Sequence, residues 1–457
     1  MNDIKFGTDG FRAVIADEFT FENVTRITQA LACYLKKRKK GQIRKGVIVG
    51  YDCRFLSDKF AMKAADILSD CGIPVRMTNR PAPTPAISAY IRENSLPCGV
   101  IITASHNPPE FNGIKIKNEF GASVGKEVTK EIESLVKNGC NALGKKPKTK
   151  IEYVEVHQPY IVFLKSYLNL RLLKKSHFHV IVDAMHGSGT GIVEKILRDT
   201  GCSVKGIRTG RDILFGGVNP EPISDNLKLL KETVIKEKAD LGIALDGDGD
   251  RIGAMCPDGK FISSHQVICL LLLHLIEDRK FKGKIVKSLN TTTLVDKIAQ
   301  YYNLPLDIVP VGFKNIASKM LKEDILLGGE ESGGIGFKGY MPERDGALSG
   351  LLILEMMAYK KKSILKIISS MEKRFGKFIY MRRDLKARLK KVLPNLKYIL
   401  GKRVLQIETY DGTKYTLEDE SWLIVRASGT EPIIRVYAEA ATKKNVLKLI
   451  EFGSNLI

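Results

Sequence analysis

Three aspartates crowd one short segment directly after an apolar run. Asp246, Asp248 and Asp250 alternate with glycines in the stretch ALDGDGDR. Carboxylates held this close repel one another unless a cation lies among them. The spacing also occurs in EF-hand calcium loops, but Arg251 and Pro257 stand where such a loop has Gly and an acidic ligand. The segment therefore fits either a Mg²⁺ site completed by phosphate or water, or a solvated Asp-Gly turn.

Ser105 follows a second apolar run, in GVIITASHNPPEFNGIKI. It could act as a nucleophile or carry a phosphoryl group, although its neighbours do not form a G-x-S-x-G elbow. A plain turn made by Ser and Asn-Pro is equally compatible with the residues. The adjacent His106 could act as a base or hydrogen-bond the loop. Lys115 suits proton transfer only if burial lowers its pKa.

Two further loops carry groups that bind phosphates and sugars. The stretch VRASGTEPIIRV offers the guanidinium, hydroxyl and backbone N–H donors that a phosphate monoester needs. These donors belong to Arg426, Ser428, Gly429 and Thr430. In GGEESGGIGF, Glu330 and Ser332 could hydrogen-bond sugar hydroxyls, and the glycines allow a ligand to approach the backbone. A flexible surface loop is the alternative for this segment.

Short runs rich in Val and Ile must hold these loops in place. Each run is bounded by Gly, Asp, Ser or Asn, and helical stretches lie between the runs, which predicts α/β units with largely parallel sheets. The runs come in pairs whose second members end in TASHNP, DGDGDR and GEESGG. We therefore expect three related α/β domains, spanning residues 1–150, 151–255 and 256–370, and a C-terminal α+β domain over 371–457. Loops at the carboxyl ends of strands would close on one central cleft.

The composition limits the class of protein. The 457-residue chain has 73 Lys+Arg against 51 Asp+Glu, a formal charge of +22, which suggests phosphate or polyanion partners. The basic stretches 36–40 and 373–393 motivate a nucleic-acid-binding alternative, but a charged run is usually a solvated face. Eight scattered cysteines form no C-x-x-C motif, and we find no signal peptide or membrane-length apolar run. We expect a soluble cytoplasmic protein without membrane or nucleic-acid partners.

Taken together, five motifs resemble those of the α-D-phosphohexomutase family. FGTDGFR, TASHNP, DGDGDR, GEESGG and RASGTEP occur in the family's order and span nearly the whole chain. The resemblance implies four domains around a central cleft, a phosphorylated Ser105, and Mg²⁺ held by Asp246, Asp248, Asp250 and a phosphoserine oxygen. It implies that Arg12 lies near the phosphoserine.

The same resemblance assigns the remaining site residues. Lys115 would move a proton, and His106 would orient the serine loop. The expected substrate contacts are Arg251, Lys314, Glu330, Ser332, Arg426, Ser428, Gly429 and Thr430. The implied reaction interconverts hexose 1-phosphate and hexose 6-phosphate through a bisphosphate, with Mg²⁺ and a hexose 1,6-bisphosphate primer.

The sugar and the oligomeric state are less defined by the sequence. Phe313 and Gly334 stand where some bacterial phosphomannomutase/phosphoglucomutases have His, which favours glucose phosphate. Mannose phosphate and glucosamine phosphate are the alternatives by the same mechanism. A Mg²⁺-dependent phosphatase built from the same loops is a further alternative, and the sequence does not indicate an oligomeric state.

Overall fold

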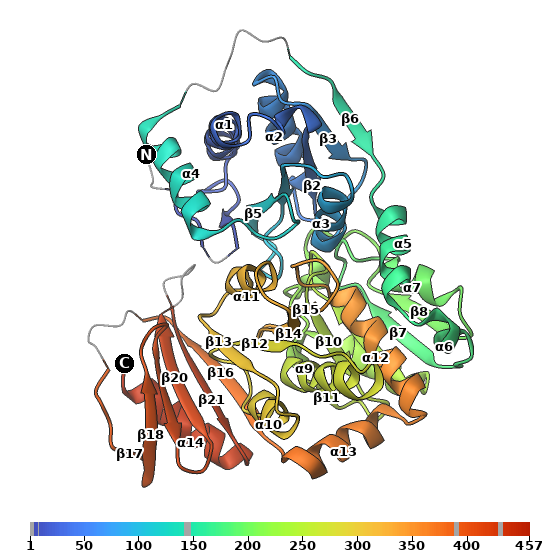
Figure 1. The fold of residues 1–457 in the computed structure, drawn as a ribbon, viewed down its shortest axis with the longest axis vertical. Helices are drawn as coiled ribbons and strands as arrows, with labels where there is room; N and C mark the ends of the chain where they lie inside the picture. The colour runs from blue at the N-terminus through green and yellow to red at the C-terminus, as the bar shows by residue number, and fades with distance from the viewer. Residues whose placement is uncertain (1–3, 8, 141–147, 388–392, 428–432) are drawn as a thin grey trace.

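The chain folds into four units, each built on its own β-sheet (Figure 1). The structure is a computed structural model that describes residues 4–7, 9–140, 148–387, 393–427 and 433–457. In Figure 1 the first unit lies above the other three, and the C-terminal sheet stands beside the third unit. The predicted class, three α/β domains followed by an α+β domain, is confirmed.

The first three sheets repeat one four-strand plan. A first strand pairs in parallel with a neighbouring strand on one side and with a second strand on the other, and an antiparallel strand follows the second one. In the first unit these strands are β2 (Val47–Tyr51), β3 (Val75–Thr78), β4 (Cys98–Ile102) and β5 (Phe111–Asn118). In the second they are β7 (His179–Asp183), β8 (Ser203–Ile207), β9 (Leu241–Leu245) and β10 (Ile252–Met255). In the third they are β12 (Lys284–Ser288), β13 (Leu306–Val309), β14 (Ile325–Gly329) and β15 (Ile335–Phe337).

Extra strands extend two of these sheets beyond the predicted domain limits. The first sheet also contains β1 (Phe11–Val14) and β6 (Ile151–Val154), and the second contains β11 (Phe261–Ile262). Because β6 pairs with β3, and β11 pairs with β10, strand pairing carries the first two sheets past residues 150 and 255. The exact domain boundaries stay a prediction.

Helices cover these sheets, and the central strands are buried over their whole length, as the apolar runs predict. The first unit has α1 (Phe21–Arg38), α2 (Ser57–Asp70), α3 (Thr84–Glu93) and α4 (Lys126–Asn138). The second has α5 (His157–Tyr167), α6 (Leu170–Lys174), α7 (Ile192–Leu197) and α8 (Lys228–Lys236). The third has α9 (Ser264–Leu273), α10 (Leu294–Tyr301), α11 (Phe313–Met320), α12 (Gly346–Lys360) and α13 (Ile364–Phe375).

The C-terminal unit differs because its sheet is entirely antiparallel among the strands that the structure describes. Its strands are β16 (Ile379–Leu385), β17 (Tyr398–Ile399), β18 (Lys402–Glu408), β19 (Thr413–Leu417), β20 (Trp422–Ala427) and β21 (Ile434–Ala440). Helix α14 (Lys443–Asn455) packs on this sheet through Val446, Leu449 and Ile450. The alternating pattern of the sequence after residue 375 therefore corresponds to a one-sided sheet.

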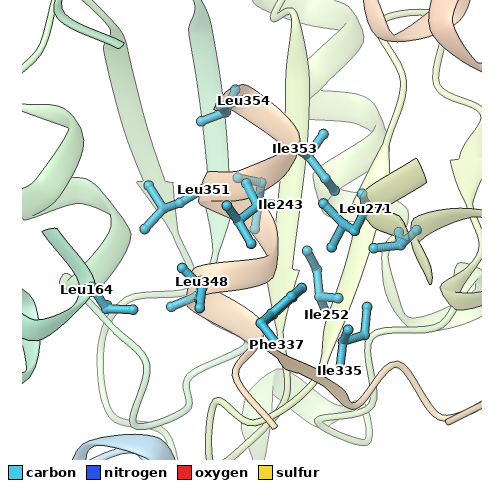
Figure 2. Packing of buried hydrophobic residues seen from close by; sticks show 14 of the residues in the cluster. Leu164, Ile243, Ile252, Leu271, Ile335, Phe337, Leu348, Leu351, Ile353 and Leu354 are labelled. Carbon is cyan, nitrogen blue, oxygen red and sulfur yellow. The ribbon is translucent and has the colours of Figure 1, made fainter. Parts of the chain in front are cut away.

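Helix α12 joins the second and third units into one core. It is buried from Gly346 to Ala358, so no polar face is exposed along most of its length. Figure 2 shows its side chains among residues of the second sheet, α9 and β15. The labelled residues include Ile243, Ile252, Leu271, Ile335, Phe337, Leu348, Leu351, Ile353 and Leu354. This shared core fixes the loops of the two units relative to each other.

No helix among the described residues is long and apolar enough to cross a membrane. The predicted cytoplasmic location stays a prediction.

Candidate active site

Three sequence motifs occupy the same position in the three related sheets. Each lies in the turn from the second parallel strand to the antiparallel strand that follows it: 103–110 after β4, 246–251 after β9, and 330–334 after β14. The serine loop and the aspartate loop meet directly, because Ser105 Oγ donates a hydrogen bond to Asp246 Oδ2 at 2.7 Å. A residue in the first unit thereby contacts one 141 positions later in the chain.

Ser105 is held rigidly in this contact. Its side chain is fully buried, and its backbone adopts a φ of 53°, which is uncommon for a residue with a Cβ atom. The guanidinium of Arg54 donates to the carbonyl oxygens of Ser105 and Asn107 at 2.6 Å, of Pro108 at 2.8 Å and of Phe111 at 3.0 Å. The sequence reasoning missed Arg54, which clamps the backbone of the whole serine loop.

The aspartate loop approaches the serine loop as closely as a glycine allows. A Cβ atom at Gly247 would lie 2.5 Å from the carbonyl oxygen of Ser105, so a side chain there would push the two loops apart. This explains why glycine separates the first two aspartates.

The three aspartates fit a metal ion. Asp246, Asp248 and Asp250 are fully buried, and one carboxylate oxygen of each lies within 4.8 Å of the others. The Oδ1 atoms of Asp248 and Asp250 are buried without a hydrogen-bond partner. Buried carboxylate oxygens without partners are costly, and an all-oxygen set of this kind suits a hard divalent cation such as Mg²⁺.

The electrostatics of the cluster also favour an additional cation. Burial raises the pKa of Asp246, and the charges of Asp248 and Asp250 raise it further. Burial acts in the same direction on Asp248, but the neighbouring Lys115 outweighs it, so the pKa of Asp248 is lowered. The charge of Lys115 therefore stabilises the ionised form of Asp248, whereas the negative charge of Asp246 is not balanced by the neighbouring side chains.

Lys115 donates hydrogen bonds to the carboxylates of this cluster. Its buried Nζ contacts Asp248 Oδ2 at 2.7 Å, Asp9 Oδ2 at 2.9 Å and Asp250 Oδ2 at 3.0 Å. Burial acts to lower the pKa of Lys115, but the three carboxylates outweigh it and raise that pKa. This is opposite to the shift that the sequence analysis required for proton transfer, because a neutral amine is needed to accept a proton.

Arg344 ties the aspartate loop to the sugar loop. One end of its guanidinium donates to Asp9 and to Asp250 Oδ2, and the other donates to Glu330 Oε2 at 3.4 Å. A second oxygen of Glu330 accepts from the backbone N–H of Gly312 at 3.0 Å. The sequence reasoning did not select Asp9 or Arg344, although Asp9 stands inside the motif GTDGFR.

A pocket lined by all four units lies beside this cluster. Of the predicted residues, it is lined by Arg12, His106, Arg251, Glu330, Ser332 and Arg426. It is also lined by unpredicted residues, among them Asp9, Phe313, Glu331, Arg344, Arg382, Arg435 and Tyr437. Six arginines on one pocket match a ligand with more than one anionic group.

One described residue among the predicted substrate contacts does not line the pocket. Lys314 points its Nζ to the carbonyl oxygen of Gly7 at 3.3 Å, and it is not among the lining residues. Ser428, Gly429 and Thr430 lie outside the described residues. The substrate contacts predicted for these four residues stay predictions.

His106 and Arg12 border the pocket on the serine side. Arg12 Nη1 donates to Asn107 Oδ1 at 2.8 Å and to the carbonyl oxygen of Ala104 at 3.2 Å, so it supports the serine loop. Burial lowers the pKa of His106, and the nearby arginines, led by Arg251, lower it further. Because its pKa is lowered, the ring is neutral at neutral pH. Its Nδ1 atom is buried without a hydrogen-bond partner, so this nitrogen is available to a ligand.

The C-terminal unit supplies the opposite border of the pocket. Arg426 Nε donates to Asp411 Oδ1 at 2.7 Å, and Asp411 Oδ2 accepts from the backbone N–H of Val311 at 2.6 Å. Asp411 thus connects this arginine to the third unit. The missed Arg435 lies two residues before Tyr437 on the same face of β21, and both line the pocket.

A buried serine against three carboxylates, beside an arginine-lined pocket, defines an enzyme of phosphoryl transfer. Comparison with known sequences specifies the family. The chain matches the models of phosphoglucomutase/phosphomannomutase α/β/α domains I, II and III over residues 3–142, 158–259 and 263–375, and of the C-terminal domain over 379–452. The chain therefore belongs to the phosphoglucomutase/phosphomannomutase family of phosphohexomutases, which move a phosphate within one sugar.

Individual relatives cover the chain almost completely. A phosphoglucomutase/phosphomannomutase of Thermococcus kodakarensis is 32% identical over 99% of this chain and 98% of its own. A phosphoglucosamine/phosphogalactosamine mutase of Sulfurisphaera tokodaii is 31% identical over 95% of each chain. A crystal structure described as a phosphomannomutase from Thermus thermophilus is 34% identical, with a TM-score of 0.88 over 100% of this chain and 99% of that one.

Proposed function

We propose that the protein interconverts hexose 1-phosphate and hexose 6-phosphate through a phosphoryl group carried on Ser105. The observation that supports this most strongly is the 2.7 Å contact between Ser105 Oγ and Asp246 Oδ2, inside a buried triad of carboxylates. Such a contact brings the serine oxygen to the position where a bound cation would neutralise a phosphoryl group.

The proposed reaction has two phosphoryl transfers. In the first, the bond between Ser105 Oγ and phosphorus breaks while the free sugar hydroxyl forms a new bond to phosphorus. The hydroxyl proton passes to the Ser105 oxygen that the phosphoryl group leaves, and the neutral ring of His106 lines the pocket with an unpartnered nitrogen that can accept a hydrogen bond. In the second, the bisphosphate has turned around and returns its other phosphoryl group to Ser105, and the proton of the serine hydroxyl passes to the sugar oxygen that is released. A hexose 1,6-bisphosphate would prime an unphosphorylated enzyme.

The side chains around Ser105 stabilise charge during both transfers. Asp246, Asp248 and Asp250 would hold Mg²⁺, which would supply positive charge at the phosphoryl oxygens. Arg12 supports the loop and Arg251 borders the pocket, so both add positive charge. Lys115, bonded to two of the ligand carboxylates, orients them and does not accept a proton.

The distant phosphate of the sugar binds at the C-terminal border. Arg426, with Arg435 and Arg382 beside it, offers guanidinium groups that can bind whichever phosphate is not being transferred. Glu330 and Ser332 line the same pocket from the third unit and would hydrogen-bond the sugar hydroxyls. Such a site accepts the sugar phosphate in both orientations.

The range of proposed sugar substrates is wider than the glucose phosphate that Phe313 and Gly334 favour. Relatives named for mannose, glucosamine and galactosamine phosphates support these sugars at least as well as they support glucose. We propose mannose and glucosamine phosphates as substrates alongside glucose phosphate. A phosphatase is less compatible with the site, because a fully buried Ser105 limits access of bulk water.

One set of assays tests the function. Glucose, mannose and glucosamine 1-phosphates are each supplied with the matching hexose bisphosphate and Mg²⁺, and formation of the 6-phosphate and release of inorganic phosphate are measured together. We expect 6-phosphate with little free phosphate. Stoichiometric release of phosphate would instead indicate a phosphatase, and salt-sensitive binding of DNA without turnover would favour the nucleic-acid alternative.

A further inference from the structure

The side chain of Arg344 bonds carboxylates in three loops, one from each of the first three units. Its side chain is 3% exposed and stands just before α12. Nη2 lies 2.7 Å from Asp250 Oδ2 and also contacts Asp9, while Nη1 lies 3.4 Å from Glu330 Oε2. The planar guanidinium presents donors on two separate nitrogens, so it can reach Asp9 and Asp250 with one and Glu330 with the other, whereas a lysine has a single nitrogen.

Gly334 leaves the space through which this side chain passes. A Cβ atom at Gly334 would lie 2.2 Å from Cδ and 2.8 Å from Cγ of Arg344. These atoms lie in the middle of the side chain, and the guanidinium beyond them is bonded to carboxylates on both sides. Arg344 therefore cannot move aside without breaking its bonds, so any side chain at position 334 competes with it for the same volume.

The consequence for the pocket concerns Glu330. Its Oε1 accepts from Gly312 N–H at 3.0 Å, and its Oε2 accepts from Arg344. Gly312 and Arg344 thereby set the orientation of the carboxylate that a sugar hydroxyl would meet. Fixed, buried hydrogen-bonding groups discriminate strongly between substrates that differ in a hydroxyl or amino group.

We propose that Gly334 and Arg344 act as a coupled pair that determines which sugar the pocket prefers, because Arg344 fills the volume beside Gly334 and fixes Glu330. This inference rests on the proposed function and identifies a specificity-determining position within the same site. Arg344 is a positioning residue for the aspartate loop through Asp250, and a specificity residue for the sugar through Glu330.

A double-mutant cycle tests the coupling. The variants are Gly334→Ala, Arg344→Gln and the combination, assayed for kcat and KM on the 1-phosphates of glucose, mannose and glucosamine. We expect Arg344→Gln to lower kcat/KM about 10- to 100-fold, the scale of a lost charged hydrogen bond, and to change the ratio of kcat/KM between sugars. Gly334→Ala should cause a similar change alone and little further loss in the Arg344→Gln background.

Two more variants separate positioning from general loss of structure. Arg344→Lys keeps the charge without the fork, so it should recover part of kcat but not the wild-type ratio between sugars. Arg92→Gln is the matched control, because Arg92 bonds the carbonyl oxygen of Tyr340 in the same segment and is exposed outside the pocket. It should leave kcat/KM and the sugar ratio unchanged.

These measurements separate failure of the coupling between Gly334 and Arg344 from failure of the proposed mutase function. Additive losses from Gly334→Ala and Arg344→Gln, or an unchanged ratio between sugars in an active enzyme, would overturn the coupling alone. A wild-type protein inactive on all three primed sugar phosphates would overturn the proposed function and, with it, the coupling.

Discussion

The two ends of the pocket are built in different ways. At the serine end, the cations are buried among carboxylates that come from the turns of two related sheets, and Lys115 is only 1% exposed. At the C-terminal end, the arginines stand on an antiparallel sheet, and the side chains of Arg382 and Arg435 are 28% and 20% exposed, whereas that of Arg426 is 9% exposed. One end is dry and internally compensated, and the other is partly wet.

This difference corresponds to two tasks. Charge interactions act most strongly where water is excluded, so the serine end suits a transition state whose charge must be met without rearrangement. Hydrated arginines can bind a phosphate in more than one position at small cost, which suits a site that must accept either end of the sugar. We therefore expect substitutions at the serine end to change mainly kcat, and those at the C-terminal end mainly KM.

Replacing the serine should have the largest effect. Ser105→Ala removes the oxygen that carries the phosphoryl group, and we expect kcat to fall by about 10⁴-fold or more, the scale of losing a covalent nucleophile. The coupled assay measures this loss, and mass spectrometry checks for absence of the phosphorylated form. Because alanine fits the same cavity, thermal unfolding should change little. Wild-type turnover by this variant would remove Ser105 from the mechanism.

Removing the charge of one proposed metal ligand should have the second-largest effect on kcat. Asp246→Asn keeps the shape of the side chain that contacts Ser105 Oγ but loses its charge, and we expect kcat to fall by about 10²- to 10³-fold, as when one electrostatic group is lost from an active site. More Mg²⁺ should be needed for half-maximal activity. The matched control is Asp258→Asn, an exposed turn carboxylate of the same unit that bonds Lys260. Equal losses in both variants would argue against a ligand role for Asp246.

The serine end was also the part that the sequence predicted best. Its residues lie in short motifs where strands end, and the shared plan of the three sheets brings such turns to one place. Arg54 and Arg344 were not found, because each acts through the fold: Arg54 bonds carbonyl oxygens of a loop about fifty residues later, and Arg344 joins three units. Nothing local to either residue indicates those contacts.

The C-terminal end was predicted less completely for a different reason. Its arginines come from neighbouring strands, and only the hydrogen-bond register of β16 and β21 brings Arg382 and Arg435 to one face. That register depends on pairings that the sequence pattern leaves undetermined. The pattern nevertheless indicated the α+β character of this unit and singled out Arg426, the last residue but one of β20, just before the predicted phosphate loop.

At that end, Arg426→Gln should act on binding. The variant loses a charged donor that lines the pocket and its bond to Asp411, and we expect KM for the sugar phosphate to rise about 10- to 100-fold while kcat changes less. Steady-state kinetics measures both constants. Arg403→Gln, on an exposed position of β18 beside Glu418, is the control and should match the wild type. A fall in kcat with an unchanged KM would contradict the division of tasks between the two ends.

The smallest expected effect concerns how firmly the C-terminal unit docks. Lys414 is buried at its contact with the third unit, where Nζ donates to the carbonyl oxygen of Leu289 at 3.0 Å and lies 5.1 Å from the centre of the Trp422 ring. Burial, together with the nearby charge of Lys287, lowers the pKa of Lys414 to about 8 against the opposing charges of Glu408, Asp296 and Glu439.

The sign of the pH effect follows from this shift. The pKa of an unfolded lysine is about 10.4, so between the folded pKa and that value the unfolded state binds more protons, and folding stability rises with pH. Below the folded pKa both states are protonated and the cost is constant. Relative to Lys414→Met, which does not titrate, the wild type should therefore gain about 2 kcal/mol at most on going from pH 7.5 to pH 9.5.

Thermal unfolding of both proteins at pH 7.5 and pH 9.5 measures this gain as a change of a few degrees in their difference. A difference that stays constant with pH would show that Lys414 is not desolvated at the contact. Because Lys414 touches neither the serine loop nor the aspartates, kcat should be the same in both proteins at pH 7.5. A lower kcat in Lys414→Met would mean that docking of the partly wet end also controls the dry end, and the two regions would then not be separable.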